Sequence, residues 1–332
     1  MAKIKTEHKG TGTRGRSGTT RTTGGDGAAR QAPAVPGILP CRGAATRPGV
    51  VGGRRVVGMG WLPDVPDWRD WTLKTGALVQ SLKQRKSKLV GTGARHPRRV
   101  DNREHCSPIE DQEQLGSCTA QAVVAMMEYL QRRSRKHHVD GSRLFVYKVT
   151  RKLLGLTGDT GAYIRSTIQA TAAFGVAPEQ HWPYDVARFE DEPEAFLYQY
   201  ASNYQALQYA RLDAPGYTGA DTLNDLKRVL ATGYVAAFGF PVYSSISNDA
   251  DIPYPTEMDT LRGGHAILAV GYDDDHQVGG QTVPSLIIRN SWGVHWGEDG
   301  YGYLPYDYVR DELTRDFWAI FKEEWIDPRQ FG

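Results

Sequence analysis

The chain has 332 residues, 40% of them hydrophobic and 23% charged, which is enough apolar material for a globular body with a sizeable core. No apolar run approaches 18 residues, so no transmembrane helix is predicted, and three cysteines are too few for a disulfide scaffold. The net charge of +2 is unevenly distributed: residues 1–100 hold 20 lysines and arginines against 5 acidic residues, and residues 101–332 hold 20 against 33. A basic arm therefore precedes an acidic body.

The first 55 residues are rich in glycine, arginine, threonine and proline, a composition that predicts a disordered basic tail. The first 30 of them contain no apolar stretch of the kind that a secretory signal peptide needs. We therefore expect a cytoplasmic protein, or one that is exported without a cleaved signal.

Residues 56–78 differ from the tail because three tryptophans lie among prolines and aspartates. The tryptophans are Trp61, Trp68 and Trp71. The segment predicts an extended strap that is neither a helix nor a regular strand. Two interpretations stay open: a pro-segment that lies on the body and blocks a cleft, or a strap that only completes the core.

Residues 82–99 predict a basic linker that contains two glycines and a proline. Nucleic-acid binding is not favoured, because no aromatic residues are interleaved with the basic ones. Docking of the basic arm on the acidic body is at least as well supported. The predicted organisation is a disordered tail at 1–55, a strap and linker at 56–96, and a folded body at 97–332.

The first half of the body has helical periodicity, and the second half has strand patterns. Helices are predicted from Ser117 onward and at 145–154, 164–174 and 222–230. Short apolar runs bounded by glycine, aspartate and proline predict strands at 235–240, 265–272 and 286–290. Helices followed by strands indicate an α+β fold with a helical lobe and a sheet lobe, and the site is expected in the cleft between them.

Cys118 lies where a reactive thiol is expected. Gly116-Ser117 is a turn signal, and Cys118 opens the predicted helix, where the positive end of the helix dipole favours a thiolate. A small buried helix cysteine would give the same pattern, so this segment alone leaves both interpretations open.

The predicted pairing of two strands brings His265 and Asn290 together. If the strands at 265–272 and 286–290 form a hairpin centred on their connecting loop, His265 faces Asn290, with Cβ atoms about 5 Å apart. The amide can then hydrogen-bond one imidazole nitrogen and leave the other facing outward. A one-residue slip of the loop centre would break this pairing.

Together these segments resemble the papain family of cysteine peptidases, in particular its prokaryotic branch. That family has Cys-Gly-Ser/Ala-Cys followed by an aromatic residue, with a histidine and an asparagine about 130–150 residues downstream. Here the run 115–119 reads Leu-Gly-Ser-Cys-Thr, His265 lies 147 residues after Cys118, and Asn290 lies 172 after it. The most specific match is Asn-Ser-Trp-Gly at 290–293, and the resemblance extends over 97–332. It implies a papain-like α+β fold of two lobes, with the active site between them.

The resemblance implies a role for five residues. Cys118 would be the nucleophile, His265 its acid–base partner, and Asn290 the residue that orients the imidazole. Gln112 would donate its side-chain amide to the oxyanion hole, and Trp292 would shield the hydrogen bond between Asn290 and His265 from water. On this basis the thiolate attacks an amide carbonyl, a thioester acyl-enzyme forms, and His265 protonates the leaving amine.

The resemblance also places five residues beside the substrate: Gly161, Ala162, Ile164, Ala266 and Trp292. The small and aliphatic ones favour an apolar substrate side chain. The chain departs from the family pattern, since Leu115 replaces a disulfide cysteine, Thr119 replaces an aromatic residue, and Ala162 replaces the second glycine of a substrate-binding pair. No long helical pro-domain is predicted before the body, which leaves the tryptophan strap as the candidate inhibitor.

The expected function is thus that of a cysteine endopeptidase that its own N-terminal segment can inhibit. The alternatives are a non-catalytic papain-fold binding protein, and a deamidase or transamidase that uses the same residues. We expect a monomer that takes a polypeptide substrate, with no cofactor, metal, membrane or nucleic-acid partner. The run Asp273-Asp274-Asp275 lacks the ligand spacing of a calcium loop and predicts a solvated turn.

Overall fold

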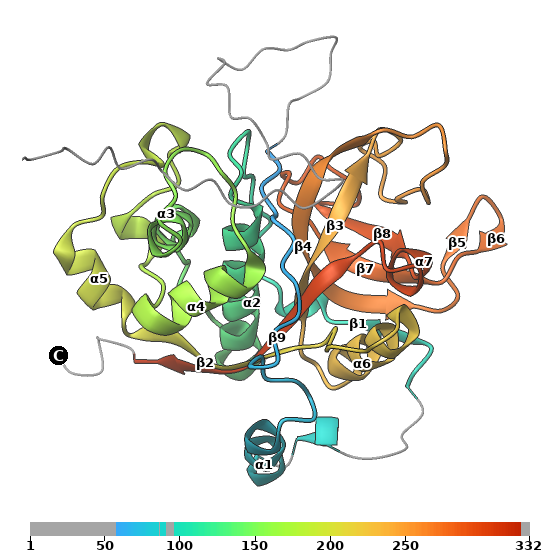
Figure 1. Ribbon diagram of the computed structural model, residues 1–332, viewed down its shortest axis with the longest axis horizontal. Coiled ribbons are helices and arrows are strands. Elements are labelled where there is room, and N and C mark those ends of the chain that lie inside the picture. Colours follow the sequence, from blue (N-terminus) through green and yellow to red (C-terminus); the bar gives the residue numbers. More distant parts are fainter. Residues whose placement is uncertain (1–57, 86, 91–95, 327–332) are drawn as a thin grey trace, which may run out of the picture. The chain divides into compact units, whose positions relative to one another are not determined.

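The computed structural model describes residues 58–85, 87–90 and 96–326, and the predicted basic tail at 1–55 lies outside this part of the chain (Figure 1). The fold is α+β, as predicted, with helices α2–α5 on one side of the body and an antiparallel sheet on the other. None of the helices in the described ranges is both long and apolar enough to cross a membrane.

The helical lobe is built on α2 (Cys118–Arg135), whose alanine, valine and methionine residues are buried along most of its length. The helix ends at Lys136, which adopts a left-handed φ of 65°. The other helices of the lobe are α3 (Arg143–Leu153), α4 (Ile164–Phe174) and α5 (Ala195–Ala201), with 3-10 turns at Arg103–His105, Glu179–His181 and Val186–Arg188. Since α2 packs against α3, α4 and the strand β4 (Leu261–Asp273), it lies at the boundary between the lobes.

The sheet lobe is antiparallel, with the strand order β2-β9-β3-β4-β7-β8 and β1 paired to β4. Its further strands are β1 (Arg99–Asp101), β2 (Tyr204–Arg211), β3 (Ala236–Tyr243), β7 (Ser285–Arg289), β8 (Tyr301–Pro305) and β9 (Arg315–Trp325). Two helices, α6 (Gly219–Ala231) and α7 (Asp307–Arg310), accompany it, and α6 begins with a capping box formed by Thr218 and Asp221. The strands are apolar on both faces because helices and loops cover the sheet.

The predicted register between β4 and β7 is wrong. Leu268 pairs with Arg289, and beyond a bulge near Val270 the pairing shifts again, so His265 has no directly opposite partner in β7. The connecting segment is not a simple turn, because it folds into a small hairpin of β5 (Gln277–Val278) and β6 (Gln281–Thr282). Asn290 follows the end of β7 and reaches His265 only through its side chain.

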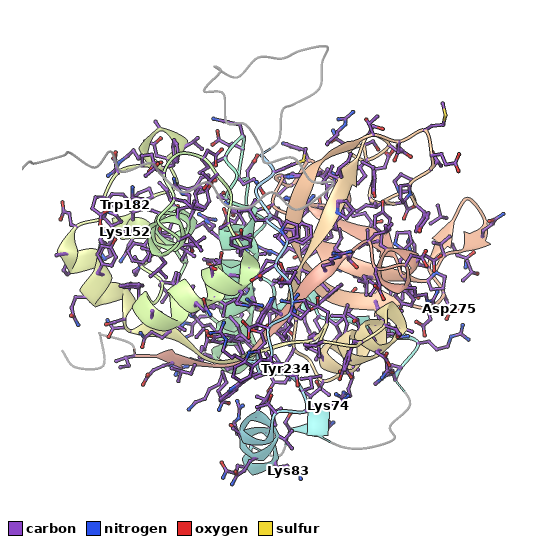
Figure 2. The ribbon with its side chains drawn as sticks, viewed as in Figure 1. Lys74, Lys83, Lys152, Trp182, Tyr234 and Asp275 are labelled. Atoms are coloured by element: carbon purple, nitrogen blue, oxygen red, sulfur yellow. The ribbon has the colours of Figure 1, made fainter. Side chains whose placement is uncertain are left out.

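The described part of the strap begins at Gly58 and leads into a helix that was not predicted, α1 (Gly76–Gln84), and a 3-10 turn at Lys88–Val90. This stretch contributes four leucines to the core on the sheet side: Leu73, Leu78, Leu82 and Leu89. Lys83 lies on the exposed side of α1 (Figure 2). The segment predicted as a linker is therefore partly folded onto the body.

The three tryptophans of the strap have different environments. Trp61 is 3% exposed and belongs to the core between the lobes, whereas Trp68 is 87% exposed and Trp71 is 41% exposed. Figure 1 shows the strap, in blue, passing between the helical lobe and the strands β3 and β4. One tryptophan thus anchors the strap, and the other two do not.

Candidate active site

Cys118 is the first residue of α2 and is fully buried. Its position follows from the local sequence, because Gly116 and Ser117 turn the chain into the helix and Ser117 occupies the cap position. The positive end of the helix dipole at this point favours the negatively charged form of a thiol. Cys118 and the buried Cys106 are both free of disulfide bonds, and Cys41 lies outside the described residues.

His265 lies in β4, the strand that packs against α2. Its Nε2 atom is 2.8 Å from Oδ1 of Asn290, and its ring stacks on Trp292 with centroids 4.6 Å apart. Its Nδ1 atom is buried and has no hydrogen-bond partner within the described part of the chain. Burial lowers the pKa of His265 to about 4, against the opposing effect of the hydrogen bond with Asn290. One ring nitrogen is thus held by the amide, as expected, and the other is unoccupied.

Gln112 is fully buried and presents its amide N–H groups toward the turn before Cys118. Its Nε2 atom donates to the carbonyl oxygen of Leu115 at 2.9 Å and to that of Gly58 at 3.0 Å. Its Oε1 atom accepts a 2.6 Å hydrogen bond from the hydroxyl of Ser291. The amide orientation is therefore fixed, with the donor side toward the cleft and the acceptor side toward Ser291.

Ser291 is a site residue that the sequence analysis missed. Besides its hydroxyl contact with Gln112, its backbone N–H donates to Oδ1 of Asn290 at 2.8 Å, and its carbonyl accepts from the Gln112 N–H at 2.9 Å. It thereby connects Asn290, which contacts the imidazole, with the predicted oxyanion donor. A serine beside Asn290 gave no chemical signal by itself, because its role depends on a residue 179 positions away.

A partly buried polar link holds the turn before Cys118 against the loop that carries Gly161. The Asp159 carboxylate accepts from the Gly116 N–H at 2.9 Å and from the Tyr147 hydroxyl at 2.6 Å, and the Gly161 N–H donates to that hydroxyl at 3.0 Å. Gly161 has a φ of 73°, and a Cβ there would lie 2.2 Å from the carbonyl oxygen of Gly60. Only glycine allows the strap to approach this closely.

The strap pairs with the predicted substrate-binding segment as an added strand. The Ala162 N–H donates to the Gly60 carbonyl at 2.8 Å, and its carbonyl accepts from the Leu62 N–H at 3.0 Å. Trp61 forms a parallel bridge with Ala162, and its N–H donates to the Gly264 carbonyl at 3.1 Å. The alanine at 162, which replaces a glycine of the family pattern, therefore does not prevent its N–H and carbonyl groups from pairing with an extended segment.

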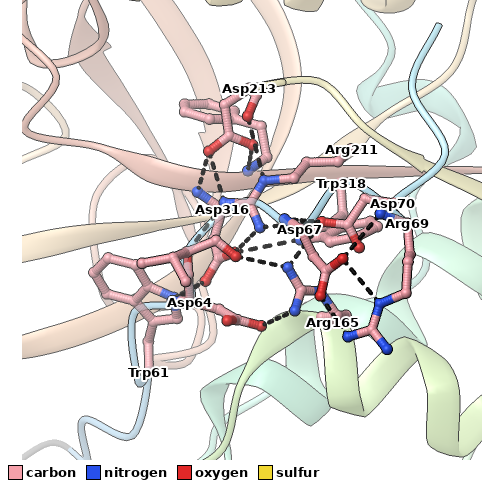
Figure 3. A network of polar contacts seen from close by, with 12 residues as sticks. Trp61, Asp64, Asp67, Arg69, Asp70, Arg165, Arg211, Asp213, Asp316 and Trp318 are labelled. Carbon is pink, nitrogen blue, oxygen red and sulfur yellow. Dashed lines mark hydrogen bonds and ion pairs between the residues drawn. The ribbon is translucent and has the colours of Figure 1, made fainter. Parts of the chain in front are cut away.

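The side chain of Trp61 enters a pocket between the lobes, in the same buried cluster as Ile164 and Ala266. Its indole Nε1 atom donates to Oδ2 of the fully buried Asp316 at 3.1 Å (Figure 3). Asp316 was not among the predicted site residues. Burial raises its pKa to about 7, although the neighbouring Arg211 acts in the opposite direction.

Acidic residues of the strap meet basic residues of the body beside this pocket (Figure 3). Arg165 lies 3.0 Å from the Asp64 carboxylate and 2.8 Å from that of Asp70, and the buried Arg211 donates to the Asp64 carbonyl at 3.1 Å. The overall charges predict a basic arm on an acidic body, whereas here the strap supplies the acidic residues and the body the basic ones. The strap is therefore held by backbone pairing, by one buried indole and by ion pairs.

The described residues contain no group of three or more histidine, cysteine, aspartate or glutamate side chains that could hold a metal ion. In the acidic run that follows β4, Asp274 accepts hydrogen bonds from Lys227 at 2.6 Å and from the Tyr306 hydroxyl at 2.8 Å. Its carboxylate is therefore engaged by side chains of the sheet lobe.

Comparisons with known proteins give one consistent result. The family model described as "Papain family cysteine protease" matches residues 96–311. The chain is 32% identical over 285 residues to an uncharacterized peptidase C1-like protein, L477, of Acanthamoeba polyphaga mimivirus, covering 81% of this chain and 88% of that protein. It is 30% identical over 225 residues to cathepsin K of Gallus gallus, covering 64% and 59% of the two chains.

Among solved structures, xylellain, a cysteine protease from Xylella fastidiosa, matches with a TM-score of 0.65 and 33% identity, covering 84% of this chain and all of that chain. A digestive procathepsin L2 proteinase of Tenebrio molitor matches with a TM-score of 0.60 and 18% identity, over 80% and 78% of the two chains, and shows the fold alone.

Proposed function

Because the chain belongs to the papain family of cysteine proteases, we propose that Cys118, His265, Asn290 and Gln112 carry out its peptide-bond hydrolysis. His265 takes the proton of the Cys118 thiol, the resulting thiolate attacks the substrate carbonyl carbon, and the carbonyl oxygen becomes an oxyanion. His265 then gives a proton to the leaving amine, which leaves a thioester, and water hydrolyses the thioester to regenerate the thiol. The observation that carries this proposal is the 2.8 Å contact between Nε2 of His265 and Oδ1 of Asn290, which leaves Nδ1 unoccupied.

Gln112 is suited to stabilise the oxyanion. Its Nε2 atom already donates to one carbonyl oxygen that lies in the cleft, that of Gly58, at 3.0 Å. Ser291 fixes the amide so that this donor needs no reorientation when negative charge develops. A preorganised donor of this kind typically lowers the barrier by about 3–4 kcal/mol.

We further propose that the strap inhibits the enzyme by occupying the substrate cleft. The Gly58 carbonyl takes up the Gln112 donor, and Gly60 and Leu62 take up both backbone groups of Ala162. Cys118 and His265 are both fully buried while the strap is in place. A substrate that needs the same backbone groups cannot bind until the strap leaves.

Alkylation of the full chain by a peptidyl epoxysuccinate near pH 6 tests the catalytic part of the proposal, read by intact mass and peptide mapping. We expect fast single-site labelling of Cys118 once the strap is displaced, and loss of that labelling in a His265→Ala variant. If Cys118 reacts no faster than Cys106 or Cys41 in any variant, the chain is a papain-fold binding protein and not a peptidase.

Two glycine substitutions test inhibition by the strap without shortening the chain, whose residues 72–90 supply core leucines. In Gly60→Ala, the new Cβ would lie 1.9 Å from the Gly116 carbonyl oxygen, so the strap cannot dock as it does. In the matched control Gly76→Ala, the new Cβ meets nothing within 4 Å. We expect faster alkylation and peptide hydrolysis for Gly60→Ala and no change for Gly76→Ala. Equal rates for Gly60→Ala and the unaltered chain would refute inhibition by the strap.

A further inference from the structure

The pocket filled by Trp61 has the shape of a slot for a planar ring. A Cβ on Gly239 would lie 1.9 Å from Cε2 of the indole, and a Cβ on Gly264 would lie 2.9 Å from its Cε3 atom. These glycines come from the neighbouring strands β3 and β4. Their missing side chains create the space that the ring occupies, and any other residue at Gly239 would close it.

The pocket contains one hydrogen-bond acceptor that faces the strap. Oδ2 of Asp316 accepts from the Trp61 indole N–H at 3.1 Å and from the Asp64 backbone N–H at 2.9 Å. Both donors belong to the strap, so Oδ2 loses both of them when the strap leaves. Asp316 adopts a left-handed φ of 64°, a conformation that is costly for a residue other than glycine, asparagine or aspartate.

The other side of the Asp316 carboxylate is held by the body itself. Its Oδ1 atom lies 3.1 Å from Nη1 of Arg211 and 3.4 Å from Nε1 of Trp318. Arg211 is fully buried and also pairs with Asp213 at 3.0 Å, and the backbone N–H groups of residues 316 and 317 hold the Asp213 carboxylate. Arg165 loses its partners Asp64 and Asp70 when the strap leaves. Arg165 and Arg211 together then balance Asp213 and Asp316, so the pocket has no need of a cationic ligand.

An extended substrate would place a side chain in the same pocket. The strap pairs with both backbone groups of Ala162, and Trp61 is the residue directly opposite. Directly opposed residues of paired strands project their side chains to the same face, whether the strands run parallel or antiparallel. The substrate residue opposite Ala162 therefore points into the slot and toward Asp316.

From this arrangement we infer that Asp316 makes the pocket a subsite for an aromatic side chain that carries a hydrogen-bond donor, tryptophan above all. The inference rests on the proposed function, since it assigns the specificity of the same cleft. An aromatic ring without a donor fills the slot but leaves a buried carboxylate oxygen unpaired, which is unfavourable. We expect discrimination of about 10- to 100-fold in favour of tryptophan over an isosteric ring that has no donor.

The test uses the full chain with the Gly60→Ala substitution that displaces the strap. Fluorogenic peptides carry tryptophan, phenylalanine, arginine or β-(3-benzothienyl)alanine, in which sulfur replaces the indole N–H, at each of the three positions before the scissile bond in turn. At one position kcat/KM should be about 10- to 100-fold higher for tryptophan than for its benzothienyl isostere. In Asp316→Asn, Arg211 retains the amide oxygen and the NH2 group faces the slot, so the preference should disappear.

Binding is measured separately on the Gly60→Ala/Cys118→Ala chain by calorimetry with the same peptides, because this readout does not require catalysis. If the tryptophan peptide binds more tightly than its isostere but the Gly60→Ala chain with Cys118 intact does not hydrolyse it, the subsite is supported. The same result contradicts only the proposed peptidase function. Equal affinities for tryptophan and its isostere, binding of neither, or a preference for arginine overturn the inference while leaving the peptidase proposal intact. If Asp316→Asn does not fold, the comparison of the two isosteric peptides decides the matter.

Discussion

Replacement of Trp61 by alanine should release the strap by a predictable amount. The indole is 3% exposed, and truncation of such a buried aromatic side chain costs about 3–5 kcal/mol. Only the docked form loses these contacts, since the side chain is in water when the strap is displaced. At about 1.4 kcal/mol for each factor of ten, the displaced population should rise by roughly two to three and a half orders of magnitude until displacement is complete.

The rate of Cys118 alkylation reports this population, because the reagent must enter the cleft that the strap fills. The matched control is Trp68→Ala, which removes the same side chain seven residues further along the same strap. Trp68 is 87% exposed, so its loss should leave the alkylation rate unchanged. Both variants should retain the secondary structure of the parent chain, as checked by circular dichroism.

Two results would contradict the reasoning. If both tryptophan variants accelerate alkylation equally, the effect arises from a general weakening of the strap and not from the buried anchor. If Trp61→Ala is no more reactive than the parent chain, the strap does not control access to Cys118.

Three further changes test the interior of the site and of the helical lobe. Asn290→Ala removes the acceptor for Nε2 of His265 and should slow Cys118 alkylation at least about 10-fold, whereas an unchanged rate would show that the imidazole is oriented by other contacts. Ser291→Ala frees the Gln112 amide and should lower kcat about 10-fold with little change in KM, and a change confined to KM would contradict a role for this amide in the transition state. Burial raises the pKa of Glu128 from 4.5 to about 7, so its protonated form stabilises the fold. This contribution to the unfolding free energy is fully present below pH 4.5 and is lost as the pH rises through 7. Between pH 4.5 and 7 the unfolding free energy of the parent should therefore fall by up to about 3 kcal/mol more than that of Glu128→Gln. Urea denaturation at several pH values measures both, and parallel pH profiles would refute this.

The parts of the fold that the sequence predicts well are those governed by local periodicity. The helix at 164–174 has the predicted bounds, and α2 begins at Cys118, one residue after the predicted start. Both are predictable because neighbouring residues in the sequence determine the turn at Gly116-Ser117 and the apolar face of each helix. The contact between His265 and Asn290 was also predicted, but from a register that is wrong. The small β5–β6 hairpin and the bulge in β4 shift the pairing, and the Asn290 side chain makes the contact from beyond the end of its strand.

What the sequence could not predict depends on residues that meet only in the folded chain. The Trp61 pocket combines Gly239, Gly264 and Asp316, which come from three strands and carry no shared motif. Helix α1 was missed because it has only 9 residues, of which only Leu78 and Leu82 are buried. Local pattern thus identifies the segments that carry Cys118, His265 and Asn290 but not the residues that cover them.

The leucines of α1 fasten the inhibitory strap to the body it is proposed to block, which makes the inhibitor part of the same molecule. Such an inhibitor acts in cis, at an effective concentration of the order of millimolar that dilution of the protein does not change. A cut on the N-terminal side of Gly58 would leave the strap tethered through Leu78 and Leu82. Lasting activation by proteolysis therefore requires a cut between Leu62 and Leu73, after which the part of the chain before the cut is free to diffuse away.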